Sequence, residues 1–486
     1  MNSLPRLSRR TCAIPTHYPE RIVQFGAGNF LRAFVDWIIE VLNEQHHFAS
    51  SVVVVKVTPH DTYEELDEQD GLFHVITQGI QNGQYVSDTR LITCIKRTVY
   101  PYLDYASYLA LARQPEIRFL ISNTTEAGIR YDAHDKSDDQ PPASFPAKLT
   151  LFLYTRYLHF AGAADKGCII LPTELIEQNG TQLRDTILRY ALQWQLENGF
   201  IRWLTEHNLF CNTLVDRIVS GYPTEQAAAL HQTLGFEDRL LVIGEPYLSW
   251  VIEAPPILER EFPVTRLKAN IRLVPDTTPY RVTKVRILNG LHTSMVMMGY
   301  LIGLESVKQC VEHPDLGQFL SDVADKEIIP ALDLPESELK QFRQDTFDRF
   351  HNPSIHHRLL SIAVNSSSKV RNRIVPSIKT YYQKHQVLPT RLVLALAAFI
   401  HFYKGNWNHQ TIPLQDEAAT LQFFNDIWQA KLTSSQRVEA VLGNTALWDD
   451  DLNQIPGLHP LMTSYLERMN TDGLLPIIQQ LNGSPT

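Results

Sequence analysis

Apolar positions in the first half of the chain alternate between short β-branched runs and stretches with helical spacing. The helical stretch Phe30–Leu42 lies between the first two runs. Strands that alternate with helices in this way indicate α/β organisation with a parallel sheet. The runs predict strands at Arg21–Phe25, Ser51–Val57, Arg118–Ser122, Gly167–Leu171 and Arg239–Ile243.

From about residue 280 the strand-like runs disappear and long helical patterns follow. They predict helices at Asp315–Ile329, Leu339–Phe350, Thr390–Tyr403 and Gln436–Leu442. We therefore predict a dinucleotide-binding α/β domain over residues 1–275 and a mostly α-helical substrate and catalytic domain over 276–486. Catalysis is expected in a cleft between the two domains.

The composition fits this two-domain interpretation. The chain has 486 residues, of which 44% are hydrophobic and 20% charged, as in a soluble globular protein. A net charge of -9 argues against nucleic acid as a partner. The five cysteines are far apart and form no Cys-x-x-Cys pair, which predicts a reducing, cytoplasmic location. The most apolar stretch, Leu392–Tyr403, is about a dozen residues, so we expect a buried helix and no membrane partner.

A glycine-rich turn, Phe25-Gly26-Ala27-Gly28-Asn29-Phe30, follows the first predicted strand and opens the first helix. Glycines allow the backbone to approach a pyrophosphate, and a helix N-terminus offers free N–H groups. We predict that these six residues bind a dinucleotide. Leu31 stands where a third glycine is usual, and a simple tight turn is the alternative.

The end of the second predicted strand does not decide between NAD and NADP. NAD enzymes often place an acid there for the ribose hydroxyls, and here only Asp61 could reach back. Lys56 could favour the 2′-phosphate of NADP, or it could simply be a solvated residue at the strand end. The residues alone therefore leave the choice of coenzyme open.

Polar residues follow the third and fourth predicted strands. Because loops at the carboxyl ends of parallel strands face a bound coenzyme, we predict contacts from Asn123, Thr124 and Glu126. Glu174 and Asn179 occupy the analogous place after the next strand. The alternative is ordinary loop chemistry without a ligand.

The segment Lys284-Val-Arg-Ile-Leu-Asn289-Gly-Leu-His292 combines the groups that alcohol oxidation by hydride transfer needs. On an α-helix, His292 and Asn289 would lie about 80° and 140° round from Lys284, within one broad face. A partly desolvated lysine can act as the base, and amides can hold the developing oxyanion. Asn289 and, further upstream, Asn212 can donate to that oxygen, and His292 can orient the substrate. A helix start with an exposed lysine is the alternative.

Two further segments carry polar clusters. Ser366–Arg373 is dense in donors and positive charge, which suits a polyhydroxylated anion or an exposed linker. His351, His356 and His357 lie close in sequence but have neither a helical His-x-x-x-His spacing nor a nearby acid. We predict that the protein holds no metal.

With these segments, the chain resembles the mannitol dehydrogenase family of long-chain polyol dehydrogenases. The marks are Arg21–Trp37, Ser122–Gly128, Leu214–Pro223 and Ile287–Thr293. The resemblance implies an N-terminal Rossmann-type domain, a helical C-terminal domain, NAD as coenzyme and catalysis without metal. It matches the catalytic lysine to Lys284 and the oxyanion-binding asparagines to Asn289 and Asn212. It also matches substrate contacts to His292 and Lys369.

The glycine-rich segment has the form found in family members that act on tagaturonate. The resemblance thus implies reversible reduction of D-tagaturonate to D-altronate by NADH, with a hexuronate or aldonate as small-molecule partner. Reduction of fructuronate, or a polyol dehydrogenase such as mannitol 2-dehydrogenase, is the alternative. Lys369, Arg371 or Arg373 are the expected partners of the substrate carboxylate.

A catalytically inactive dinucleotide sensor would have lost part of the catalytic set, yet Lys284, Asn289 and His292 are all present. The sequence does not decide between a monomer and a dimer.

Overall fold

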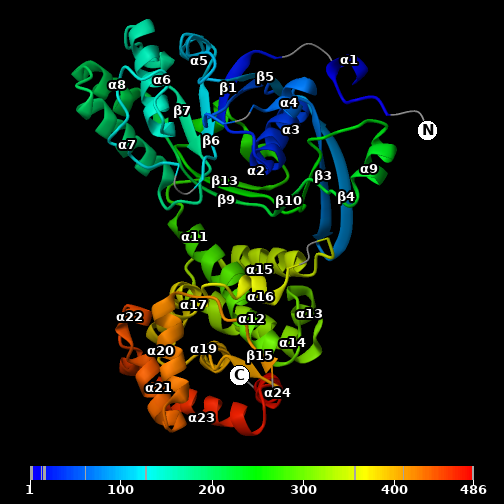
Figure 1. The fold of residues 1–486 in the computed structure, drawn as a ribbon, viewed down its shortest axis with the longest axis vertical. Helices are drawn as coiled ribbons and strands as arrows, with labels where there is room; N and C mark the ends of the chain where they lie inside the picture. The colour runs from blue at the N-terminus through cyan, green and yellow to red at the C-terminus, as the bar shows by residue number, and fades with distance from the viewer. Residues whose placement is uncertain are drawn as a thin grey trace. The chain divides into compact units, whose positions relative to one another are not determined.

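The computed structural model describes residues 4–12, 14, 18–60, 62–125, 128–354, 357–408 and 410–483. The chain separates into two compact units (Figure 1). The first contains Met1–Gln78 and Tyr85–Thr277, and the second contains Gly79–Gln84 and Thr278–Thr486. The short segment Gly79–Gln84 thus groups with the second unit, which no pattern in the sequence indicated.

The first unit is built on a six-stranded sheet of order β5-β2-β1-β6-β7-β8. All neighbouring strands in this sheet are parallel, as predicted. Strand order runs outward in both directions from β1 and β6, and ligands of such sheets bind at this switch point. The strands are β1 (Glu20–Phe25), β2 (Ser51–Val55), β5 (Ile95–Val99), β6 (Phe119–Ser122), β7 (Ile169–Pro172) and β8 (Leu209–Phe210).

Helices cover both faces of this sheet, which explains why its inner strands, such as β2, are largely apolar and buried. Along β2, Val52 and Val54 enter the core on one face, whereas Val53 and Val55 enter the core on the other. The first core contains the helix that follows the glycine-rich turn: α2 (Asn29–Leu31), η1 (Arg32–Asp36) and α3 (Trp37–His46). The second contains α5 (Tyr105–Ala112), α6 (Phe145–His159), α7 (Asn179–Gln193) and α8 (Asn198–His207).

Two smaller sheets complete the first unit. One has the order β10-β11-β3-β4 and includes the predicted strand near residues 239–243, observed as β11. The other has the order β13-β12-β9. Their strands are β3 (Phe73–Gln81), β4 (Gln84–Ile92), β9 (Asn212–Asp216), β10 (Val219–Gly221), β11 (Val242–Gly244), β12 (Ser249–Glu253) and β13 (Asn270–Val274). The unit also has α1 (Arg9–Cys12), α4 (Glu64–Glu68), η2 (Ala164–Lys166), α9 (Ala227–Leu234), α10 (Leu258–Glu261) and η3 (Val264–Arg266).

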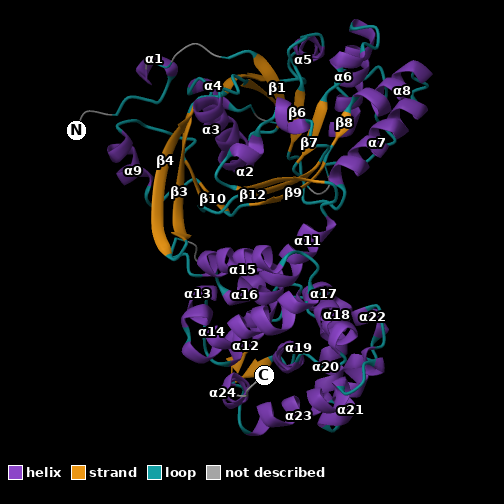
Figure 2. Cartoon of the chain, turned by 180° about the vertical axis from the view of Figure 1, so that it is seen from behind, coloured by secondary structure: helices purple, strands orange, loops and turns teal. Residues whose placement is uncertain are grey.

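The second unit is mostly helical, as predicted (Figure 2). Its central helices, α12 (Gly290–Leu301) and α19 (Thr390–Phe402), are buried on nearly all sides. Around them lie α11 (Thr278–Lys284), η4 (Val285–Asn289), α13 (Val307–Glu312), α14 (Pro314–Asp322), η5 (Val323–Ile328), η6 (Ile329–Ala331), α15 (Glu336–Phe350), α16 (Leu359–Ile362), α17 (Ser366–Arg373) and α18 (Val375–His385). The C-terminal part has β14 (Asn406–Trp407), β15 (Gln410–Thr411), α20 (Ala418–Gln429), α21 (Ser434–Leu442), α22 (Thr445–Trp448), η7 (Leu452–Gln454), α23 (Leu458–Thr471) and α24 (Leu475–Gly483). In the described ranges, no helix is long and apolar enough to cross a membrane.

Candidate functional site

The glycine-rich turn lies at the carboxyl end of β1, at the switch point of the parallel sheet. Gly26 adopts φ +112, which favours glycine, and its N–H donates to the Val55 carbonyl at 3.0 Å. Gly28 is exposed, stands at the N-cap of the following helix and gives that helix no side-chain cap. A Cβ on Gly28 would meet nothing within 4 Å. The turn therefore leaves N–H groups and open space at a helix N-terminus, as a phosphate requires.

The departure at the third glycine is accommodated by packing. Leu31 is 1% exposed and turns inward beneath the turn, where a Cβ on Gly26 would lie 3.3 Å from its Cδ1. The ring of Phe25 is completely buried, so only its backbone can reach a ligand. Asn29 is exposed, and its Oδ1 accepts from Arg32. Phe30 stacks on Phe34 with ring centroids 4.8 Å apart.

Asn123 and Thr124 lie at the end of β6, next to the glycine-rich turn. Their side chains bond to the neighbouring loop: Asn123 Nδ2 donates to the Thr173 carbonyl at 3.0 Å, and Thr124 Oγ1 donates to Glu174 Oε1 at 3.0 Å. Burial raises the pKa of the Glu174 carboxyl, against the opposing effect of its hydrogen bonds. Asn123 and Thr124, which were predicted to contact a coenzyme, thus join the loop after β6 to the loop after β7 by hydrogen bonds at the switch point. Glu126 lies outside the described residues.

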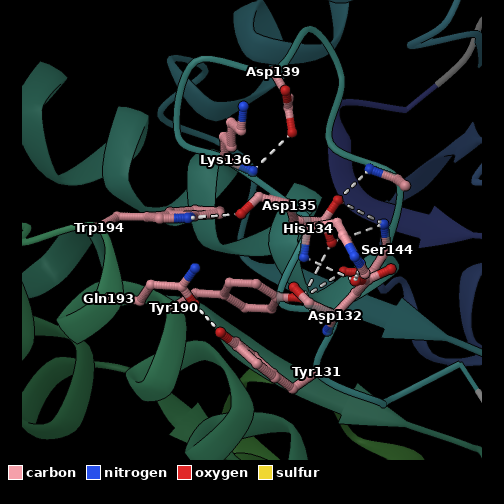
Figure 3. A network of polar contacts seen from close by, with 11 residues as sticks. Tyr131, Asp132, His134, Asp135, Lys136, Asp139, Ser144, Tyr190, Gln193 and Trp194 are labelled. Atoms are coloured by element: carbon pink, nitrogen blue, oxygen red, sulfur yellow. Dashed lines mark hydrogen bonds and ion pairs between the residues drawn. The ribbon is translucent and has the colours of Figure 1, made fainter.

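The loop that continues from this segment is held by the polar network of Figure 3. The Asp135 carboxylate is almost fully buried and accepts from the N–H of Ser144 and the hydroxyl of Tyr190, both at 3.1 Å. Trp194 Nε1 donates to the Asp135 carbonyl at 3.1 Å. Because these groups satisfy one another, the network fixes the loop against α7 and is best understood as structural.

Lys56 follows β2 at the same edge of the sheet. Its ammonium lies 4.6 Å from the centroid of the Tyr63 ring, a cation–π distance. Asp61, the acid that could reach back to a ribose, lies outside the described residues. The described residues at this edge therefore present a positive charge over an aromatic ring. They do not decide between NAD and NADP.

Asn212 is buried at the start of β9, and its amide is held on both sides. Its Oδ1 accepts from Thr181 N at 2.9 Å, and its Nδ2 donates to Glu253 Oε1 at 3.0 Å. Glu253 is its partner in strand register on β12, and the other carboxylate oxygen accepts from Thr277 N at 3.2 Å. An amide nitrogen carries two hydrogens, so Asn212 keeps one N–H for a ligand. Glu253 was not among the predicted site residues, although its position at the end of a strand could have indicated a role in the site.

In the second unit, Lys284, Asn289 and His292 come from one continuous helix that contains a π-turn. Lys284 ends α11, η4 follows, and the Gly290 N–H bonds to the Val285 carbonyl five residues earlier. In an i→i+5 turn, residue i+5 lies above residue i as residue i+4 does in an α-helix. Asn289 therefore stands nearly above Lys284, closer than the α-helical angle of about 140° predicted. The structure brings these two residues onto one narrow face.

Lys284 and Asn289 are half-buried, and His292 is 8% exposed. The Asn289 side-chain amide has no hydrogen-bond partner among the described residues, so its N–H₂ is available to a substrate oxygen. His292 packs against Phe350, with ring centroids 4.4 Å apart, and against His357 at 5.2 Å. Burial lowers the pKa of the His357 imidazole, which favours the neutral form of that ring.

His357 is the one of the three histidines singled out in the sequence that packs against His292 within the described residues. His351 Nδ1 lies 2.7 Å from the Phe347 carbonyl of its own helix, and His356 lies outside the described residues. In the part of the chain that the structure describes, no group of three or more His, Cys, Asp or Glu side chains is arranged to hold a metal ion. Metal-independent catalysis stays a prediction.

The polar segment 366–373 forms helix α17, not a linker, and its basic residues point to different sides. Lys369 Nζ donates to the carbonyls of Ile362 at 2.7 Å and Val364 at 2.6 Å. Arg373 Nη1 donates to Thr293 Oγ1 of α12 at 3.1 Å. Arg371 instead pairs with Asp449 at 3.4 Å. The helix thus separates Arg371 from the other two cations.

Two family models match the chain. The mannitol dehydrogenase Rossmann domain matches residues 20–265, and the mannitol dehydrogenase C-terminal domain matches residues 276–470. Together they account for most of the sequence and for both units of the structure.

Curated relatives match over nearly their full length. The altronate oxidoreductase of Yersinia enterocolitica is 45% identical over 473 residues, covering 96% of this chain and 98% of the relative. The altronate oxidoreductase of Bacillus subtilis is 44% identical over 466 residues, covering 96% of each.

Two solved structures share the fold. A D-sorbitol dehydrogenase in substrate-free form superposes with a TM-score of 0.80 at 21% identity, covering 96% of this chain and 99% of that one. The mannitol 2-dehydrogenase of Pseudomonas fluorescens, in a ternary complex with NAD and D-mannitol, gives 0.68 at 20% identity, with coverage of 99% and 100%. At such identities the likeness shows the fold alone.

Proposed function

The chain belongs to the mannitol dehydrogenase family of oxidoreductases, and we propose that it catalyses the reversible reduction of D-tagaturonate to D-altronate with NADH. The observation that carries this proposal is the 45% identity to altronate oxidoreductases over 96% of the chain. The intact face of Lys284, Asn289 and His292 supports it.

The glycine-rich turn fits a nicotinamide dinucleotide. Gly28 offers room for close approach, and the helix that begins at Asn29 has no side chain capping its N-terminus. The N–H groups of this turn would hold the pyrophosphate, with Asn123 and Thr124 at the adjacent strand end. When bound, the reduced coenzyme supplies the hydride.

The residues of the second unit handle the proton and the oxygen. The ketone to be reduced is C5, counted from the carboxylate carbon, and hydride addition turns its oxygen into an alkoxide. Lys284 in its ammonium form donates a proton to that oxygen and becomes a neutral amine; in the reverse direction the amine accepts the proton. Asn289 donates an N–H to the same oxygen, which stabilises its developing charge, and the family resemblance assigns the same role to Asn212 of the first unit. His292, held by Phe350 and His357, orients a neighbouring hydroxyl.

A steady-state screen tests this proposal. Purified enzyme is assayed with NADH and NADPH against tagaturonate, fructuronate and fructose. We expect the highest kcat/KM with tagaturonate and NADH. Oxidation of NADH by fructose but not by tagaturonate would rule out the proposed substrate, and a preference for fructuronate would assign the chain to that sibling reaction.

A further inference from the structure

One face of α17 carries two cations that pair with no carboxylate in the described part of the chain. Lys369 and Arg373 are four residues apart, so they lie on the same side of the helix. Arg371 lies about 200° round from Arg373 and pairs with Asp449. For the described residues, neither Lys369 nor Arg373 forms an ion pair with an acid.

Arg373 is tied directly to the helix that carries Lys284 and Asn289. Its Nη1 donates to Thr293 Oγ1 at 3.1 Å, and that hydroxyl donates to the Asn289 carbonyl at 2.9 Å. Thr293 is one helical turn after Asn289, so the guanidinium reaches the face that the catalytic residues share. Burial lowers the pKa of Arg373, and no acid among the described residues offsets that cost.

The neighbourhood adds positive charge. Burial and then the proximity of Arg373 lower the pKa of Lys369, because the two cations repel one another. Asp416 opposes this shift, but its carboxylate is engaged by the N–H and hydroxyl of Ser367. Arg286 donates to Ser377 Oγ at 3.1 Å, and Ser377 in turn donates to the Arg373 carbonyl at 2.9 Å.

Half-buried cations held close together by backbone and hydroxyl groups are costly unless an anion completes the site. The guanidinium fork matches a carboxylate through two parallel hydrogen bonds. We propose that Arg373, with Lys369 one turn before it, binds the carboxylate of the sugar-acid substrate. This inference rests on the proposed function, since it names the residues that distinguish a sugar acid from a neutral polyol.

The test compares two ligands that differ only at C1, where one carries a carboxylate and the other a neutral group. D-Altronate and D-altritol, in which a CH₂OH group replaces the carboxylate, are titrated by calorimetry into the enzyme–NADH complex, where neither alcohol can react. The wild type is expected to bind altronate on the order of 100-fold more tightly than altritol. Arg373→Ala should reduce this ratio to below about tenfold by weakening altronate alone, and Arg373→Lys should restore part of it.

Arg371→Ala is the matched control, because it removes the same charge from the other side of the same helix, and the ratio should not change. An unchanged ratio in Arg373→Ala, or equal binding of both ligands by the wild type, would overturn the inference. If Arg373→Ala does not fold, Arg373→Gln and Arg373→Lys give the same comparison. Failure of the proposed function is separate: it would appear as no turnover of altronate with NAD⁺ by the wild type, whatever the binding ratio.

Discussion

Each unit contains a long helix that a π-turn interrupts near a predicted functional residue. In the first unit this π-turn is Arg32–Asp36, just after the glycine-rich turn. In the second it is Val285–Asn289, just after Lys284, and that unit has a further π-turn at Val323–Ile328. All five residues of the first are buried, whereas only Ile287 and Leu288 are buried in the second.

The polar groups of the two turns are used differently. In the first turn, the Ala33 carbonyl accepts from Arg217, and the Asp36 carboxyl faces Gln24 in the core. In the second turn, Lys284 and Asn289 remain half-exposed on one face. The same local irregularity therefore anchors a helix beneath the glycine-rich turn in one unit and presents the proposed catalytic side chains in the other. π-Turns are frequent at functional sites, and here position decides what the turn does.

The largest effect on this comparison is expected from Asn289→Ala. Loss of an oxyanion donor should lower kcat with tagaturonate by about 100- to 1000-fold. Thermal unfolding should change little, because the amide is half-exposed and makes no hydrogen bond within the described structure. Asn372→Ala, at an exposed position on α17, is the control. A stable variant with wild-type kcat would remove Asn289 from the site.

Arg217→Met, in contrast to Asn289→Ala, should lower stability and leave kcat unchanged. Its guanidinium donates to the Ala33 and Glu245 carbonyls and lies 5.1 Å from the Trp37 ring centroid. Removal of the guanidinium that donates to two buried carbonyls should lower the free energy of unfolding by about 3 kcal/mol, measured in urea, while kcat of the folded enzyme is retained. An unchanged urea midpoint would show that the first π-turn needs no such anchor.

Asp36→Asn should be more stable than the wild type, by a difference in unfolding free energy that grows as pH rises. Burial raises the pKa of Asp36 from 3.8 to about 7 in the folded protein. Between these values the unfolded chain ionises the carboxyl and the folded protein does not, so the wild type loses stability as pH rises through this range. The advantage of the Asn variant should grow from pH 4 to 7 and level off above that, reaching on the order of 4 kcal/mol. A pH-independent difference in the unfolding free energy would contradict the assignment.

The smallest effects distinguish the two glycines of the turn. Gly26→Ala forces an alanine to φ +112 and should cost about 1–2 kcal/mol of stability. Gly28 has φ -64, and a Cβ at this position would meet no other atom within 4 Å. Gly28→Ala should therefore leave stability unchanged while the KM for NADH rises about tenfold. Equal NADH KM values for wild type and Gly28→Ala would argue against a pyrophosphate at this turn.

Much of the architecture could be predicted because it depends on local patterns. The valine run observed as Ser51–Val55 is apolar on both faces whatever surrounds it, and the helix at Thr390–Phe402 is apolar all round. The hairpin of β3 and β4 was not predicted. Its second strand, Gln84–Ile92, is mostly polar and exposed, so no apolar alternation marks it.

The site was predicted by residue type but not by geometry. A π-turn depends on a hydrogen-bond offset that composition does not encode, so the near alignment of Asn289 with Lys284 was hidden. Arg371 and Arg373 are indistinguishable within a basic run, and only the phase of α17 separates them. Glu253 and Asn212 meet through strand pairing across 41 residues of sequence, which periodicity does not reveal.

The central claim is that Lys284 is the acid and base of a hydride-transfer reaction. It is tested most directly by single-turnover oxidation of bound NADH by tagaturonate in the wild type and in Lys284→Ala. We expect the variant to bind NADH with unchanged affinity, since the glycine-rich turn is intact, and to oxidise it about 1000-fold more slowly. A rate within tenfold of the wild type would contradict the claim.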